Sequence, residues 1–124
     1  MIDQNRLFEA GPDPFGRTWK VQFRWLQTAI SIRHADTVDV KFWISSNGSE
    51  PQEKIIALPH PELLQLTDGG RTLTDALCLR LAAAHLRHMI ETTEDIDKTL
   101  VTLRPEELAQ YHRKLHGETV PQPR

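Results

Sequence analysis

The stretch VDVKFWI (residues 38–44) decides the fold of this chain. Its apolar residues recur at every second position, which is the period of a β-strand with one buried face: Val38, Val40, Phe42 and Ile44. Asp39, Lys41 and Trp43 fall between them and therefore belong to the opposite face. We predict a strand here, with the first set facing the core.

The segment that begins at Thr18 is predicted to be one long strand that contains a bulge. Its first half has apolar residues at odd positions: Trp19, Val21, Phe23 and Trp25. Its second half has them at even positions, at Ile30 and Ile32. The phase slips by one residue, and no turn-forming residue occurs where it slips, so we place a β-bulge between Leu26 and Ala29.

Turn signals then join the strands into a meander. Residues 34–37 are the expected connection to the strand at 38–44. After that strand, Asn47-Gly48 tolerates positive φ and begins a loop, beyond which Lys54 to Leu58 forms a third strand. We expect antiparallel pairing of at least three strands.

Helical patterns dominate the second half of the chain. Pro61 suits the first position of a short helix, and a long helix follows from about Thr74 to Thr92, with Thr72 or Thr74 as its cap. Residues 98–103 fit an edge strand and a helical stripe equally well. Pro105 begins a last helix, and Gly117 is expected to stop it.

These elements predict an α+β fold: an N-terminal antiparallel β-meander of three or more strands, packed against a long central helix with a C-terminal helix alongside. Residues 1–17 are expected to form an arm, because two prolines and two glycines between positions 11 and 16 disfavour regular pairing. Residues 18–117 are expected to form a single domain. Residues 118–124, which are polar and proline-rich, are expected to form a flexible tail.

Composition excludes several classes of function. The chain has 124 residues with 15 Lys and Arg against 17 Asp and Glu, so it offers no basic surface for nucleic acid. No apolar run approaches the roughly 18 residues that a membrane helix needs, and we expect no contact with a membrane. The N-terminus lacks a secretory pattern, and the single cysteine, Cys78, has no disulfide partner; both features predict a cytoplasmic protein. Cys78 itself falls on the apolar helix face, where it should be a protonated and inert residue.

A histidine pair on the long helix is the first candidate for chemistry. His85 and His88 stand three residues apart and Glu91 three further on, a spacing that places side chains on one side of a helix, as a metal site requires. Zinc generally needs at least three ligands on well-placed elements, and the HExxH arrangement is absent. The alternative is a pair of boundary histidines that hydrogen-bond to neighbouring groups.

A loop before the long helix is the second candidate. Gly69, Gly70, Arg71 and Thr72 could present backbone N–H groups and a guanidinium to an anion. The loop matches neither of the glycine-rich phosphate-binding patterns, and glycines at such a turn also serve simply to reverse the chain.

Trp43 is the third candidate, because a large aromatic residue on the outer side of a strand needs cover. The N-terminal arm or last helix could fold over it, a second protomer could bury it, or it could line a ligand groove. In a symmetric dimer, Arg24, Lys41 and Trp43 would mark the contact surface.

No set of residues converges on a reaction. The sequence therefore predicts a small, non-catalytic, cytoplasmic interaction or regulatory module that needs no cofactor and forms a homodimer or binds a protein partner. The alternative is a small-molecule or anion-binding protein, or a hydrolase, with a pocket between sheet and long helix that uses His85, His88 and Arg71. A binder or enzyme should place both histidines at the mouth of a pocket.

Overall fold

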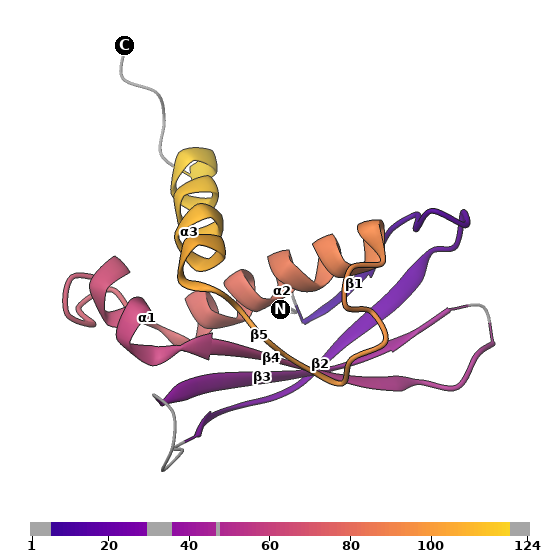
Figure 1. Cartoon of the computed structure of the whole chain (residues 1–124), viewed down its shortest axis with the longest axis horizontal. Coiled ribbons are helices and arrows are strands. Elements are labelled where there is room, and N and C mark those ends of the chain that lie inside the picture. Colours follow the sequence, from indigo (N-terminus) through magenta and orange to yellow (C-terminus); the bar gives the residue numbers. More distant parts are fainter. Residues whose placement is uncertain (1–5, 30–35, 47, 120–124) are drawn as a thin grey trace.

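The computed structural model describes residues 6–29, 36–46 and 48–119, which form a five-stranded sheet with three helices on one face (Figure 1). The strands are β1 (Leu7–Ala10), β2 (Trp19–Ala29), β3 (Thr37–Ser45), β4 (Gln52–Pro59) and β5 (Leu100–Thr102). The helices are α1 (His60–Leu66), α2 (Asp75–Thr92) and α3 (Pro105–Thr119). The face that carries the helices is the inner face of the sheet, and the opposite face is the outer face.

The predicted meander is confirmed. Strands β1 to β4 pair antiparallel in sequence order. The four apolar residues predicted to face the core from β3 do so, and none of them is more than 5% exposed. Asp39, Lys41 and Trp43 lie half-buried on the outer face. The α+β architecture expected from the sequence is therefore the one observed.

The bulge in β2 is present, but its predicted position in residues 26–29 is wrong. The pairing register shifts between Phe23 and Trp25, which makes Arg24 the extra residue. Because the shift comes earlier, Trp25 pairs with Lys41 and lies on the outer face. Trp25 continues the odd-numbered apolar pattern of the first half of the strand, so the sequence pattern does not reveal the earlier register shift. Ile30, Ile32 and the connection at 34–35 lie outside the described residues, as does Asn47 of the predicted turn.

The N-terminal arm predicted for residues 1–17 contains a regular strand, so the expectation of no pairing before Thr18 is wrong. Strand β1 pairs antiparallel with β2, from Leu7 opposite Gln22 to Ala10 opposite Trp19. The prolines and glycines occupy only the connection between these two strands. They end the strand without preventing it.

Asp13 organises that connection. Its carboxylate accepts hydrogen bonds from the backbone N–H groups of Phe15 and Arg17 at 2.9 and 2.8 Å, from Arg17 Nε at 2.9 Å and from Trp19 Nε1 at 3.1 Å. Burial by itself would raise the pKa of Asp13, but these hydrogen bonds outweigh it and lower the pKa to about 2. Gly11 adopts φ +117°, and a Cβ atom there would lie 2.8 Å from the carbonyl oxygen of Arg17.

Helix α2 covers the inner face and follows the predicted bounds. The Thr74 side chain caps it by accepting a hydrogen bond from Leu77 N at 3.0 Å, and Thr93 ends it with φ 60°. Its buried residues are Cys78, Leu79, Leu81, Ala82, Ala83, His85, Leu86, Met89 and Ile90. Burial raises the pKa of Cys78 to about 11, so this thiol is protonated, as predicted.

The segment left open at residues 98–103 is a strand. Strand β5 pairs parallel with β4 after a crossover through α1 and α2. Lys54 of β4 fixes the loop that precedes it: this residue is 2% exposed, and its Nζ donates to the carbonyl oxygens of Ile96 and Lys98. Burial lowers the pKa of Lys54, and the nearby Asp97 opposes that shift.

The short and last helices begin as expected. Pro61 lies in the first turn of α1, and α3 begins at Pro105, with Leu108 fully buried. The prediction that Gly117 stops α3 is wrong, because the helix continues to Thr119. A glycine within a helix costs only about 1 kcal/mol and does not by itself end it. Within the described ranges, no helix has both the length and the apolar character needed to cross a bilayer.

Candidate functional site

The outer face of the sheet is the larger of two candidate sites. Each strand contributes one large apolar residue to it: Leu7, Trp25, Trp43, Ile55 and Leu100. Leu7 and Leu100 are 58% and 55% exposed. Figure 1 shows all three labelled helices on the other side of the sheet. Exposed apolar residues gathered on one face are typical of an interaction surface.

Two tryptophans and a lysine form the centre of this face. The Lys41 Nζ lies 5.5 Å from the centroid of the Trp25 ring and 5.9 Å from that of the Trp43 ring. The same Nζ forms an ion pair with Glu53 Oε1 at 2.8 Å. Cation–π contacts of this kind are attractive and favour the packing of the two indole rings around the lysine. Trp25, Trp43 and Lys41 therefore form one cluster on the outer face.

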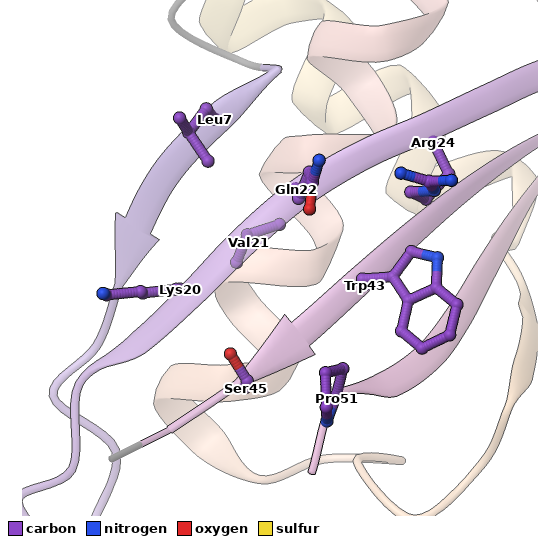
Figure 2. Close-up of a pocket in the computed structure, with 8 residues that line it drawn as sticks. All are labelled: Leu7, Lys20, Val21, Gln22, Arg24, Trp43, Ser45 and Pro51. Atoms are coloured by element: carbon purple, nitrogen blue, oxygen red, sulfur yellow. The ribbon is translucent and has the colours of Figure 1, made fainter. Parts of the chain in front are cut away.

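A hollow of about 340 Å³ adjoins this centre. It is lined by Leu7, Lys20, Val21, Gln22, Arg24, Trp43, Ser45 and Pro51, drawn in Figure 2. Both of its charged lining residues, Lys20 and Arg24, are basic. The hollow thus offers an apolar floor with a positive border.

The structure brings together the three residues predicted to mark an interface. Arg24 and Trp43 line the hollow, and Lys41 contacts the Trp43 ring. Of the three explanations for Trp43, the last helix is excluded, because α3 packs against α1 and α2 above the inner face (Figure 1). Strand β1 of the predicted arm reaches the border of the hollow with Leu7 but belongs to the sheet itself. Among the residues that the structure describes, no arm covers Trp43, so a second protomer and a ligand groove are the explanations that we consider further.

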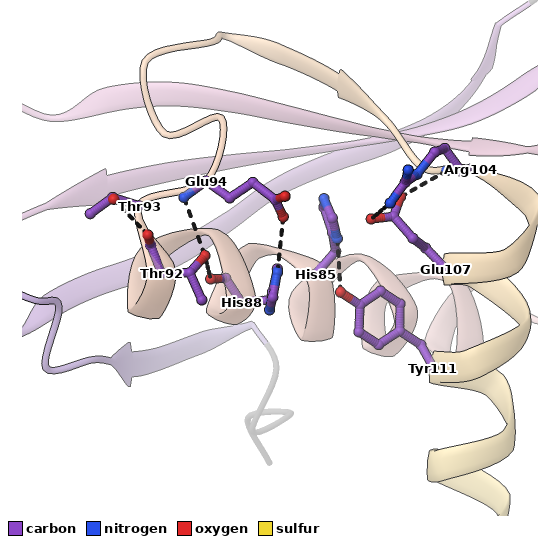
Figure 3. A network of polar contacts seen from close by, with 8 residues as sticks. All are labelled: His85, His88, Thr92, Thr93, Glu94, Arg104, Glu107 and Tyr111. Atoms are coloured by element: carbon purple, nitrogen blue, oxygen red, sulfur yellow. Dashed lines mark hydrogen bonds and ion pairs between the residues drawn. The ribbon is translucent and has the colours of Figure 1, made fainter.

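The second candidate site is a cavity of about 240 Å³ between α2, β5 and the start of α3. Its lining residues are His85, Glu94, Asp95, Val101, Thr102, Arg104 and Glu107. His85 is only 2% exposed, and its Nδ1 lies 2.9 Å from Tyr111 Oη. Figure 3 shows the imidazole between Glu94 and the pair formed by Arg104 and Glu107.

Arg104 holds Glu107 in place at this cavity. The carboxylate accepts hydrogen bonds from Arg104 N at 3.0 Å and from Arg104 Nη2 at 3.3 Å. The first of these contacts is a cap at the beginning of α3. Although burial opposes it, this pair of contacts lowers the pKa of Glu107, which is therefore ionised.

The electrostatic environment of the cavity is acidic. Burial raises the pKa of Tyr111 to about 12, and Glu107 and Glu94 add to that shift. Burial lowers the pKa of His85, with Glu107 as the largest opposing charge. His85 is therefore a neutral imidazole at pH 7, surrounded by negative charge.

The predicted metal ligands do not meet at one point. The rings of His85 and His88 stack with centroids 6.0 Å apart. His88 Nε2 pairs with Glu94 Oε1 at 2.9 Å, whereas Glu91 is exposed. Among the residues that the structure describes, no three His, Cys, Asp or Glu side chains are placed to hold a metal ion. The metal assignment stays an untested prediction without support from this geometry.

The predicted anion loop uses its N–H groups internally. Gly69 N donates to Leu64 O at 2.7 Å, and the N–H groups of Gly70, Arg71 and Thr72 also donate to carbonyl oxygens of the same turn. The Arg71 guanidinium pairs with Asp68 at 3.4 Å. Arg71 precedes the start of α2, whereas His85 lies ten residues into the helix, about 15 Å along its axis. The structure therefore separates Arg71 from the histidines it was expected to join.

Sequence reasoning missed several residues of these two sites, Glu94 among them. The odd-numbered pattern placed Trp25 on the same face as Trp19, Val21 and Phe23, and this was wrong because the bulge was placed too late. The packing of α3 beside α2 was expected, but no pattern in the sequence indicates that Tyr111, Arg104 and Glu107 meet His85 there. The even-numbered Leu26 was the one available signal for the earlier bulge, since it continues the phase of Ile30 and Ile32.

Comparison of the chain with protein-family models, with curated proteins and with solved structures finds no match. The two candidate sites are therefore inferred only from the geometry described above.

Proposed function

We propose that this protein is a non-catalytic interaction module that forms a homodimer through the outer face of its sheet. One observation carries the proposal: every strand places a large apolar residue on a face that no described helix covers. A buried, protonated cysteine suits a reducing compartment, so we place the module in the cytoplasm.

The balance of charges favours a second copy over other partners. The strand residues of the outer face include three basic side chains, Lys20, Arg24 and Lys41. They also include three acidic ones, Glu9, Asp39 and Glu53. A mixed face of this kind is complementary to itself when related by a two-fold axis. It is poorly suited to a phosphate backbone or an anionic membrane.

The size of the face is adequate for a dimer. Strand β3 has nine residues, which corresponds to a length of about 30 Å, and five strands span about 24 Å. Because β1 and β5 are short, the face measures about 600 Å² for each copy, or about 1,200 Å² in total. That value lies at the lower end of specific protein interfaces.

The test is the mass of the protein in solution. We expect the wild-type chain to sediment at twice its 14.2 kDa, and Leu100→Glu to sediment as a monomer. Introducing a charge into an apolar contact from both copies disfavours association strongly. Trp43→Ser should shift the protein in the same direction with its helix content retained.

Phe15→Glu is the matched control. Among the described residues, Phe15 is the most exposed large apolar one, at 75%, but it lies in the connection between β1 and β2 and outside the outer face. We expect it to leave the dimer intact. A wild-type monomer, or a dimer that survives Leu100→Glu, would reject the proposal.

A further inference from the structure

We propose that the hollow beside Trp43 is covered by strands β4 and β5 of a second copy, so that the two-fold axis of the dimer runs along β3. This inference rests on the proposed dimer and adds its geometry. With this axis, the half of the outer face formed by β1 and β2 lies over the half formed by β4 and β5 of the second copy. The symmetry of the dimer then covers both hollows.

Aligned packing of two sheets allows two directions for the axis, which lies in the plane between the sheets. An axis along the strands places β3 over β3 of the second copy and β1 over β5, because the strand order is β1-β2-β3-β4-β5 (Figure 1). An axis across the strands places every strand over its own copy with the two ends exchanged. The residues of the outer face decide between these two directions.

The large apolar residues of the outer face lie in two neighbouring rows across the sheet. The pairing register defines one row as Trp25, Lys41, Ile55 and Leu100 and the next as Leu7, Gln22, Trp43 and Glu53. An axis along β3 places Trp25 opposite Ile55 of the partner subunit and Trp43 opposite its own copy. It also brings Leu7 and Leu100 of the partner subunit, residues that are 58% and 55% exposed, within one row of each other. Each large apolar residue of the face then meets another.

The position of the hollow favours the same direction. Its lining comes mainly from β1, β2 and β3, and Figure 2 shows Arg24 and Trp43 on neighbouring strands at its border. An axis across the strands keeps β1 and β2 over β1 and β2 of the second copy, so Leu100 on β5 cannot reach the hollow. It also places the basic residues Lys20 and Arg24 over the same basic half of the other copy. An axis along β3 instead brings the exposed Leu100 of the partner subunit to the hollow.

Charge complementarity supports this arrangement. Among the described residues, the ion pairs include neither Lys20 nor Arg24, although Glu9 lies opposite Lys20 on β1. An axis along β3 places Glu53 of the partner subunit over these two basic residues. The Glu53 side chain is 39% exposed and binds Lys41 of its own copy through Oε1, so its Oε2 can accept a hydrogen bond from Arg24 of the partner subunit. Lys41 lies near the axis, where Glu53 of its own copy balances its charge.

The experiment uses analytical ultracentrifugation to measure how tightly fluorescently labelled Arg24→Glu binds different unlabelled chains. Arg24→Glu alone opposes two carboxylates at both symmetric contacts, so its dissociation constant should rise about tenfold or more above the wild-type value. Glu53→Arg alone opposes two cations at both contacts and should be weakened in the same way. In the mixed dimer both contacts again join opposite charges, so the two variants should bind each other about tenfold or more tighter than either binds itself.

Glu91→Arg is the matched control. It makes the same change of charge as Glu53→Arg, but on an exposed residue of α2, on the helical side of the sheet. It should bind labelled Arg24→Glu no more tightly than the wild-type chain does. Equal binding by Glu53→Arg and Glu91→Arg, with a dimeric wild-type chain, would overturn the axis along β3 and leave the proposed dimer standing. A monomeric wild-type chain would overturn both.

Cross-linking tests the direction of the axis independently of charge. Leu7→Cys and Leu100→Cys, treated together with a short bis-maleimide, should cross-link to each other, and neither should cross-link to its own copy. The native Cys78 is buried and does not compete. An axis along β3 separates the two copies of β5 by about four strand spacings, or roughly 19 Å. A Leu100→Cys chain that cross-links to itself would therefore overturn the proposal.

Discussion

The two faces of the sheet differ although the same strands form both. On the inner face of β3, every apolar residue is at most 5% exposed and packs under α2. On the outer face of the same strand, Lys41 and Trp43 are only half-buried, and Lys41 contacts the rings of both Trp43 and Trp25. One strand thus contributes to stability with one set of side chains and presents a partner surface with the other. Substitutions at adjacent positions of β3 should therefore have different effects. An inner-face substitution should mainly lower the free energy of unfolding, and an outer-face substitution should mainly weaken association.

The largest expected effect tests this difference directly. Phe42→Ala should lower the free energy of unfolding by about 3–5 kcal/mol, because Phe42 is fully buried and its removal leaves a cavity. Trp43→Ser, one residue further on, should cost the monomer only about 1–2 kcal/mol. Urea unfolding at a protein concentration low enough to dissociate any dimer measures both values. Comparable losses for the two variants would show that the outer face is also part of the core.

A smaller effect compares two lysines on opposite faces. Lys54→Met removes the donor to two loop carbonyl groups on the inner face and should cost about 2–3 kcal/mol. Lys20→Met, on the outer face, should change stability by no more than about 0.5 kcal/mol. Hydrogen exchange in residues 93–99 should accelerate only in the first variant. If it does not, another interaction holds this loop.

The smallest effect concerns pH. Because burial lowers the pKa of His85 below its ordinary value of 6.5, the unfolded state takes up a proton at higher pH than the folded state. This contribution to stability is fully present above pH 6.5 and is lost as the pH falls through 6.5 toward the lower pKa of the folded protein. His85→Gln should flatten the decline of the melting temperature on mild acidification. The same decline in wild type and variant would assign it to other groups.

Local patterns in the sequence were sufficient for most of the fold. The alternation in residues 38–44, the cap expected at Thr72 or Thr74 and the proline at position 105 each predicted an element correctly. Each of these signals reports how a few neighbouring residues avoid water or satisfy a helix end. The errors arose where the local signal was ambiguous. Trp25 fitted the odd-numbered apolar pattern, so the bulge was placed too late. The prolines and glycines after Ala10 were interpreted as excluding a strand, whereas they only terminate one.

The candidate sites were less predictable. Arg24, Lys41 and Trp43 were grouped from strand alternation as a predicted interface. The structure places them near one another on the outer face, and their role as an interface is still a proposal. His85 and His88 were paired by their helical spacing, and their rings are neighbours. Their partners Tyr111 and Glu94 were not foreseen. Contacts between side chains of different helices and strands produce no periodic pattern in the sequence.

The sequence by itself determined which residues of each strand and helix avoid water, because burial imposes a period of two on a strand and about 3.6 on a helix. Tertiary structure alone decided the rest: the register of β2 against β3, the parallel position of β5, and the approach of α3 to His85. These features depend on contacts between segments far apart in the chain. Such contacts are settled by the packing of the whole core rather than by any local run of residues.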